Sequence, residues 1–242
     1  MPLQTVLDAK GVCETRGSRR YYFSKRGEAG SKLINPFVKF SNKISCALDN
    51  RRDMKICGEK LGVFVPSPFD EEIGATGCQS APYPGLDIVL RDLKLTRTDS
   101  FIDIGCGKGR AIAYLVNRGC PCKITGIEIN PEVAAVAARW TKRYPNVEII
   151  EGDAFGLDYN DYTVLFMYRP MERDVFICFI NLLEMTLTHP VTLYYYVDGQ
   201  SGYYLNDRPG WQLIERHEIY RARGRYIHLE PQRYSVWTYK GI

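Results

Sequence analysis

The stretch 101-FIDIGCGKGR-110 decides the fold of this chain. Residues 101–104 have the composition of a buried strand, with apolar side chains around a single acid. Glycine then occupies every second position, and 110–117 has the apolar spacing of a helix. Residues without side chains let the backbone turn sharply and approach a ligand closely. The stretch therefore predicts a strand, a glycine turn and a helix, the first unit of a Rossmann-like α/β domain.

On either side of this stretch, short apolar runs alternate with helical patterns, which is typical of βαβ units. Asn130-Pro131 predicts a helix start, because Asn130 can cap it and Pro131 suits its first turn. Two C-terminal segments alternate as half-buried antiparallel strands do. We expect a doubly wound, mostly parallel seven-stranded sheet with an antiparallel C-terminal strand pair. The predicted strands are 101–104, 122–127, 147–150, 163–167, 191–197, 211–220 and 233–239, and the other helices are 86–95 and 172–187.

The first eighty residues have a different character. Gly, Pro and Ser interrupt them, and only 31–48 has a helical pattern, broken by Pro36. Residues 1–62 hold 13 Lys/Arg and 6 Asp/Glu, a net charge of +7, whereas 63–242 hold 19 and 22, a net charge of −3. We expect a basic N-terminal extension, 1–80, that serves as a lid or substrate-binding segment for a domain at 81–242. It could attract an anionic partner such as RNA, or be either a solvated helical face or a segment that packs on the acidic body.

Composition excludes several classes of protein. The chain is 45% apolar and 25% charged, as in soluble globular domains. No apolar run approaches the roughly 20 residues that cross a bilayer, and the N-terminus lacks a secretion signal, so we expect a cytoplasmic protein without a membrane partner. The eight cysteines form no Cys-x-x-Cys pair and there are three histidines. We therefore expect no metal site, and cysteines that remain free thiols.

The spacing of the glycines separates classes of ligand. A dinucleotide fingerprint starting at Gly105 would need glycine at position 110, where Arg110 stands. Asp103 lies two residues before the first glycine, where its carboxylate can meet the ammonium group of an amino acid moiety. The plainer alternative is a tight packing turn that holds no ligand.

Two further acids follow the next two predicted strands. Glu128 stands 19 residues after Gly109, where a carboxylate can accept hydrogen bonds from both ribose hydroxyls. Asp153 follows the third strand and can accept from an adenine amino group. Either acid alone could be an ordinary surface residue. Three acids after three consecutive strands indicate one adenosine-containing ligand.

The runs FIDIGCGKGR, ITGIEINP and IIEGDAF resemble the successive motifs of class I S-adenosylmethionine-dependent methyltransferases, over roughly residues 83–197. The resemblance implies S-adenosylmethionine as cofactor and S-adenosylhomocysteine as product. It implies that the methionine part lies on the glycine turn, the ribose on Glu128 and the adenine on Asp153. The cofactor-binding residues would be Asp103, Gly105, Cys106, Gly107, Gly109, Glu128, Ile129, Asp153 and Ala154.

In that family the methyl acceptor lies over the end of the fourth strand, here 166-FMYRPM-171. Many N-methyltransferases have Asn/Asp-Pro-Pro-aromatic there, whereas this chain keeps Pro170 but has Arg169 and Met171 beside it. The loop and 81-APYP-84 are more similar to non-SET protein-lysine methyltransferases. The candidate acceptor residues are Tyr168, Arg169 and Pro170, with Tyr83 as a candidate substrate contact. Tyr168 could hold an amine by cation–π contact or through its hydroxyl, or only cover the sheet.

The leading interpretation is methylation of an amine, on a protein lysine or a small molecule. RNA methylation that uses the basic extension is a second interpretation, and a non-catalytic cofactor-binding module is a third. No Ser/His/Asp set stands out, and no histidine falls at a predicted strand end. A general base is therefore not identified, and alignment of the reactants can suffice for methyl transfer.

Overall fold

The computed structural model describes residues 6–7, 13–14, 34–68 and 74–241. Its main strands are β3 (Ser100–Ile104), β4 (Lys123–Glu128), β5 (Val147–Glu151), β6 (Val164–Tyr168), β7 (Val191–Tyr196), β8 (Trp211–Ile219) and β11 (Gln232–Tyr239). Its α-helices are α1 (Pro36–Cys57), α3 (Tyr83–Val89), α4 (Arg110–Asn117), α5 (Pro131–Thr141) and α6 (Arg173–Thr186). Short elements are β1 (Val6–Leu7), β2 (Cys13–Glu14), β9 (Arg221–Ala222), β10 (Arg225–Tyr226), η1 (Ala154–Gly156), η2 (Tyr159–Asp161) and η3 (Gly202–Asp207).

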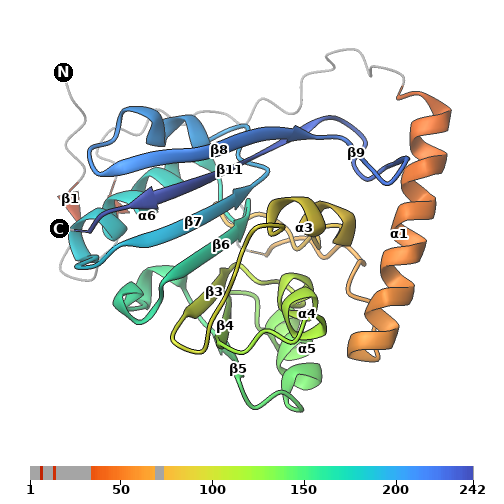
Figure 1. Ribbon diagram of the computed structural model, residues 1–242, viewed down its shortest axis with the longest axis horizontal. Helices are drawn as coiled ribbons and strands as arrows, with labels where there is room; N and C mark the ends of the chain where they lie inside the picture. The colour runs from red at the N-terminus through yellow and green to blue at the C-terminus, as the bar shows by residue number, and fades with distance from the viewer. Residues whose placement is uncertain (1–5, 8–12, 15–33, 69–73, 242) are drawn as a thin grey trace.

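The seven main strands form one sheet in the order β5-β4-β3-β6-β7-β11-β8 (Figure 1). The strands from β5 to β7 are parallel, and β11 lies antiparallel between β7 and β8. Strand order reverses between β3 and β6, and in open α/β sheets ligands bind at such a switch point. The predicted sheet, including its antiparallel C-terminal pair, is confirmed.

Alternating strand residues divide the core between the two faces of the sheet. Phe101 and Phe166 are stacked with ring centroids 6.2 Å apart, on the face that α3 and α4 cover. Ile102 and Leu165, their chain neighbours, face the other way and pack with α6. Both faces are therefore covered, which explains why the parallel strands are almost continuously apolar.

From residue 100 onward, the helices and strands predicted from local sequence patterns lie close to their observed positions. The Asn130 side chain accepts from the Glu132 and Val133 amides, and Pro131 is the first residue of α5, as predicted. The helix expected at 86–95 is misplaced, because α3 begins at Tyr83 and ends at Val89. Pro84 sits in its first turn, where the missing N–H leaves no partner unsatisfied.

Helix α1 differs most from the sequence interpretation. Pro36 does not interrupt the helix but begins it, and Asn35 caps it by accepting from the Phe37 amide at 2.9 Å. The helix runs on past residue 48 to Cys57. Its inward stripe is largely polar, with Ser41, Ser45, Asp49 and Asp53 all buried. A search for apolar spacing therefore could not predict which face of this helix is buried.

The described part of the N-terminal extension shares the core of the sheet. Ile56, Cys57 and Leu61 lie in the same hydrophobic cluster as Tyr83 and Phe101. A boundary at residue 80 thus does not separate two cores. No helix among the described residues is long and apolar enough to cross a membrane.

Six cysteines, at positions 46, 57, 78, 106, 120 and 122, are free. Cys178 is disulfide-bonded, which corrects the expectation that the cysteines are all free thiols.

Candidate cofactor site

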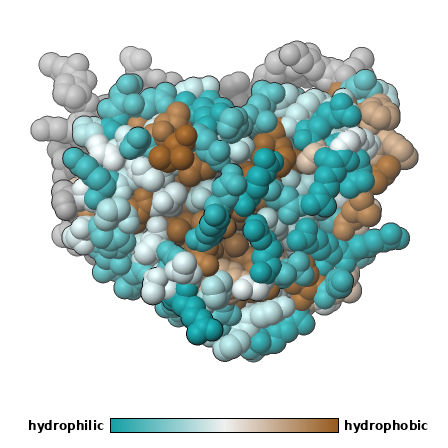
Figure 2. Space-filling view, in the orientation of Figure 1, coloured by the Kyte–Doolittle hydropathy of each residue, from teal (hydrophilic) through white to brown (hydrophobic). Residues whose placement is uncertain are grey.

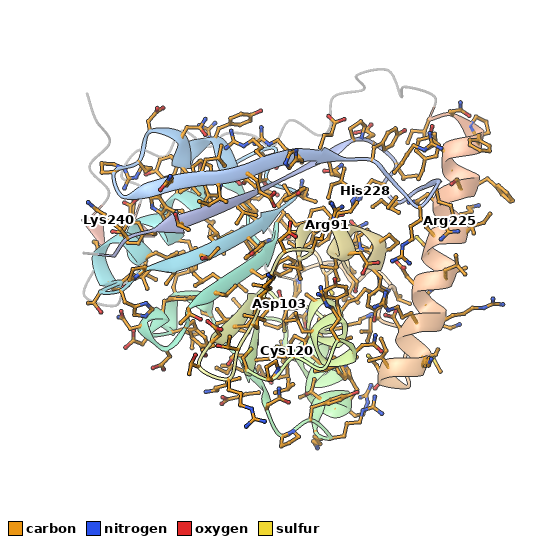
Figure 3. The ribbon with its side chains drawn as sticks, viewed as in Figure 1. Arg91, Asp103, Cys120, Arg225, His228 and Lys240 are labelled. Atoms are coloured by element: carbon orange, nitrogen blue, oxygen red, sulfur yellow. The ribbon has the colours of Figure 1, made fainter. Side chains whose placement is uncertain are left out.

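An open pocket lies at the carboxyl ends of β3, β4, β5 and β6. Each of these strands contributes its last residues or the residues that directly follow it. Figure 3 shows Asp103 near the middle of the molecule, toward the end of β3. The pocket is lined by residues 103–107, 127–129 and 152–155, by 166, 168, 170 and 171, and by 75–81 from the N-terminal segment, with 110, 111 and 175 completing the wall.

The glycine turn has the geometry that its sequence predicts. Gly105, Gly107 and Gly109 have φ angles of 68°, 57° and 87°, which side chains rarely permit. A Cβ on Gly105 would lie 2.3 Å from the Pro170 Cβ, and one on Gly107 would lie 2.7 Å from the Cys78 Sγ. The glycine turn therefore forms the floor of the pocket, and Pro170 and Cys78 pack directly against it.

Gly109 has a different role from the other two glycines. It caps the N-terminus of α4, and a Cβ there would approach the Trp140 ring at 3.0 Å. It is not among the residues that line the pocket. Its glycine is explained by backbone conformation and helix packing, so the structure gives no support for a direct ligand contact.

Asp103 is the most unusual ionisable group of the pocket. The residue is 3% exposed, and its carboxylate makes no hydrogen bond or ion pair with the described part of the chain. Burial, and to a smaller extent the nearby Glu128, raise its pKa to about 8. A buried carboxylate without a partner is costly, so a site that keeps one is suited to a cationic ligand.

Glu128 ends β4 and is fixed by the backbone. Its two carboxylate oxygens accept from the Gly107 and Asn130 amides, each at 2.9 Å. Burial raises its pKa, while these backbone hydrogen bonds act in the opposite direction. Each oxygen keeps a second lone pair, so the carboxylate can still accept from two hydroxyl groups.

The loop after β5 completes the wall at the third strand. The Asp153 carboxylate accepts from the Phe155 amide at 3.0 Å through Oδ1 and so caps η1. Ala154 and Ile129 also line the pocket. Cys106 lines it too and is buried, and burial holds the pKa of its thiol well above the usual range. Cys106 is therefore an apolar wall residue rather than a nucleophile.

The loop after β6 is tied down onto the N-terminal segment. Thr76 donates from its hydroxyl to the Arg169 carbonyl at 2.8 Å and from its amide to the Pro170 carbonyl at 3.0 Å. Arg169 has a φ of 40°, a strained value for a residue with a side chain. Tyr168 and Pro170 line the pocket, whereas Arg169 does not. Arg169 thus bends the loop, and its two neighbours face the pocket.

Tyr83 lies apart from the other predicted site residues. It is 1% exposed and is not among the residues that line the pocket. The Arg52 guanidinium lies 4.2 Å from the centroid of the Tyr83 ring, and the backbone amide of Tyr83 donates to the Asp49 carboxylate. The structure gives no support for a substrate contact at Tyr83, which belongs to the packing between α1 and α3.

Sequence reasoning missed two parts of the site. One is the wall at residues 75–81, which is fixed by isolated β-bridges from Cys78 to Val65 and from Ala75 to Met171. These residues carry no recognisable motif, and their place depends on long-range pairing. The other is Arg110, which lines the pocket and forms a two-pronged ion pair with Asp53 of α1, at 3.0 Å and 2.6 Å. Nothing in the sequence links these two positions, 57 residues apart.

The hydrogen-bond acceptors and the buried acid of the pocket fit S-adenosylmethionine. Asp103 offers a buried negative charge to an ammonium group, Glu128 offers lone pairs for hydroxyl groups, and Asp153 can accept from an amino group. The positive φ angles of Gly105 and Gly107 leave the floor free of side chains. No group of three or more His, Cys, Asp or Glu side chains among the described residues could hold a metal ion.

Comparison with known proteins agrees with this geometry. Residues 101–176 match a family model described as a methyltransferase domain. A methyltransferase from Pyrococcus furiosus has a similar structure, with 17% identity, a TM-score of 0.53, and coverage of 84% of this chain and 100% of that chain. A mutant of MtNAS is 15% identical with a TM-score of 0.50, covering 86% and 76%. An RNA methyltransferase from Salinibacter ruber, in complex with S-adenosyl-L-homocysteine, is 21% identical with a TM-score of 0.47, covering 66% and 92%.

No curated protein matches the sequence. The sheet order and the glycine turn nevertheless agree with a Rossmann-like methyltransferase fold, and the family model matches the part of the chain that contains the glycine turn.

Proposed function

We propose that this chain binds S-adenosylmethionine in the pocket after β3–β6 and transfers its methyl group to an amine nitrogen. The observation that carries the proposal is Asp103, a buried carboxylate without a partner beside the glycine turn. The ammonium group of an amino acid moiety would neutralise this charge, whereas a neutral or anionic ligand would not. When bound, S-adenosylmethionine supplies an electrophilic methyl group on a sulfonium.

The roles of the chain's own residues follow from their positions. Asp103 would hold the ammonium group of the cofactor, with Gly105 and Gly107 giving the backbone its close approach. Glu128, fixed by two amides, would accept from the ribose hydroxyls. The adenine would lie by Asp153 and Ala154, and Cys106 and Ile129 would add apolar contacts.

The charge of the pocket supports an amine as acceptor. Three carboxylates line it, whereas its one lining cation, Arg110, is neutralised by Asp53 of α1. Since no unpaired cation lines the pocket, an amine in its charged form can enter it without repulsion from the chain. The amine must lose a proton to water before it attacks, because its free lone pair forms the new bond to the methyl carbon as the bond from that carbon to the sulfonium sulfur breaks.

Tyr168 is suited to position that nitrogen. Its ring lines the pocket and is held edge-on by Tyr196, with centroids 4.9 Å apart. Burial raises the pKa of its hydroxyl, so the group stays protonated at neutral pH and can accept an N–H hydrogen bond. The aromatic face also attracts an alkylammonium group. Pro170 packs over Gly105 and closes the same side of the pocket.

The test is incubation with methyl-labelled S-adenosylmethionine and cell lysate, followed by separation into protein, RNA and small-molecule fractions. We expect label in an amine product. Tyr168→Phe should lower the transfer rate by up to about tenfold, because it removes one hydrogen bond of about 1 kcal/mol. It should leave cofactor affinity unchanged. Cofactor binding without label in any fraction would instead favour a non-catalytic binding module.

A further inference from the structure

Helix α1 turns an apolar stripe toward solvent. Phe37, Phe40, Ile44 and Leu48 follow one another at spacings of three and four residues, so they lie on one face. They are 63%, 64%, 40% and 39% exposed. Figure 2 shows apolar side chains, brown and tan, along the right-hand edge of the molecule where Figure 1 places α1. Since the polar stripe of this helix is buried, the usual orientation of a surface helix is inverted.

The charges that α1 exposes are all positive. Lys39, Lys43, Arg51 and Lys55 are exposed, and these four cations lie beside or in line with the apolar stripe. The two acids of the helix, Asp49 and Asp53, are buried and face Arg110 on the opposite side. The solvent-facing side of α1 is therefore a positively charged surface on which the helix exposes no acidic side chain.

An arginine-rich hairpin, β9–β10, extends this surface. Its sequence, 221-RARGRY-226, has three arginines in six residues. It is anchored to α1, because the Tyr226 amide donates to the Ser41 hydroxyl at 3.0 Å and the Ser45 hydroxyl donates to the Tyr226 carbonyl at 3.1 Å. Figure 3 shows Arg225 beside α1.

Aromatic rings and guanidinium groups alternate where the hairpin meets the helix. Phe37 contacts Tyr226 edge-on with centroids 6.2 Å apart, and Tyr226 contacts Tyr220 at 4.7 Å. The Arg221 guanidinium lies 4.8 Å from the Tyr226 ring centroid. Arg223 is paired with Asp87, so Arg221 and Arg225 are the arginines best placed to meet a ligand.

We propose that this surface, formed by the outer face of α1 and the β9–β10 hairpin, binds single-stranded RNA. Phosphates of such a strand would meet Lys39, Lys43 and the hairpin arginines, and unpaired bases would stack on the exposed phenylalanine rings. Guanidinium forks suit phosphate better than point charges do. The interleaving of cations with aromatic rings matches this ligand.

An anionic membrane is the competing partner for a cationic apolar helix. A helix that lies in a membrane interface keeps its apolar face clear of charge along its length. Here Arg51 and Lys55 continue the line of the apolar stripe, and the arginine hairpin stands beside Phe37. The arrangement therefore favours a strand that offers phosphates and bases together.

Binding at this surface does not depend on the proposed function, because no residue of α1 or of the β9–β10 hairpin lines the pocket. The two sites are linked through one side chain, since Arg110 lines the pocket and pairs with Asp53 of α1. An RNA held on the outer face of α1 would thus be separated from this wall of the pocket by the helix itself.

The test is fluorescence anisotropy of a labelled single-stranded RNA with the full chain and no cofactor. We expect micromolar affinity that falls steeply with added salt. The double variants Lys39→Glu/Lys43→Glu and Arg221→Ser/Arg225→Ser should each weaken binding at least about tenfold. Phe37→Ala/Phe40→Ala should weaken it by about tenfold through lost base stacking, with a smaller change in salt dependence. All these side chains except Arg225 are exposed, so folding should be retained.

Lys240→Glu is the matched control, an exposed cation on the far side of the molecule (Figure 3), and should leave RNA affinity unchanged. The proposal is overturned if the wild type does not bind RNA at low salt, or if the α1 and hairpin variants bind like the control. If the wild type sediments with phosphatidylcholine/phosphatidylserine vesicles but does not bind RNA, and these variants abolish the sedimentation, the proposal is overturned in favour of a membrane partner. RNA that binds but receives no label would leave this surface intact and refute RNA as the acceptor.

Discussion

Asp103→Asn will weaken S-adenosylmethionine binding by about a hundredfold and make the free protein more stable. The loss of affinity follows from removing a buried charge-assisted hydrogen bond to the ammonium group, worth about 1.5–3 kcal/mol. The gain in stability follows because the carboxylate is buried without a partner when no ligand is bound. Calorimetric titration and urea unfolding measure the two effects on the same sample.

The stability effect has a defined dependence on pH. The folded pKa of Asp103 is raised to about 8, above its unfolded value of about 4. Between these values the folded state holds more protons, so the free energy of unfolding should fall as pH rises, and level off above about 8. Asp103→Asn should lose this slope. The exposed Asp161→Asn is the control and should retain it. Equal slopes in wild type and Asp103→Asn would show that the carboxyl is not destabilising.

Arg110→Ala will lower the free energy of unfolding by about 3–5 kcal/mol, the cost of leaving one partner of a buried ion pair alone. Its guanidinium and the Asp53 carboxylate are 5% and 0% exposed. The Asp49 carboxylate also lies 3.9 Å from the same guanidinium, so Arg110→Ala leaves two buried carboxyl groups without this cation. Urea unfolding at neutral pH measures the change, and Asp53→Ala should have a similar effect.

A double variant separates the energy of the Arg110–Asp53 ion pair from the effects of each single substitution. Arg110→Met/Asp53→Leu should be less destabilised than the sum of the single variants, because it leaves no unpaired charge at these positions. Arg139→Ala breaks the exposed pair with Glu59 and should cost less than about 1 kcal/mol. Additive effects in the double variant, or equal effects of Arg110→Ala and Arg139→Ala, would contradict the importance of this buried contact.

The sheet and the cofactor pocket could be predicted because their signals are local. The glycine turn, the Asn130-Pro131 helix start and the alternation of β8 and β11 each depend on neighbouring residues alone. Parallel strands that share an orientation bring Asp103, Glu128 and Asp153 to one edge. Three positions in the sequence were therefore enough to place one pocket.

The N-terminal helix could not be read in the same way. Its burial depends on polar groups, Ser41, Ser45, Asp49 and Asp53, whose partners lie far along the chain. The apolar residues that a sequence search relies on, Phe37 and Phe40, are on the exposed face. Hydrophobic periodicity thus gives the wrong face when a helix is held by hydrogen bonds and an ion pair.

The shape of the loop after β6 could not be predicted for a related reason. It depends on contacts with Thr76 and Gly74. Those contacts join segments about 93 residues apart. The sequence indicates Arg169 as a candidate acceptor residue, whereas in the structure its backbone conformation and its carbonyl shape the loop.

Titration of S-adenosylmethionine into the wild type at several pH values tests the central claim most directly. If the ionised Asp103 carboxylate meets the ammonium group of the cofactor, affinity should rise by nearly tenfold per unit between about pH 6 and pH 7.5. Binding should also release a proton, seen as a heat that depends on the ionisation enthalpy of the buffer. Asp103→Asn should show neither effect. An affinity independent of pH in the wild type, with no proton release, would contradict the account.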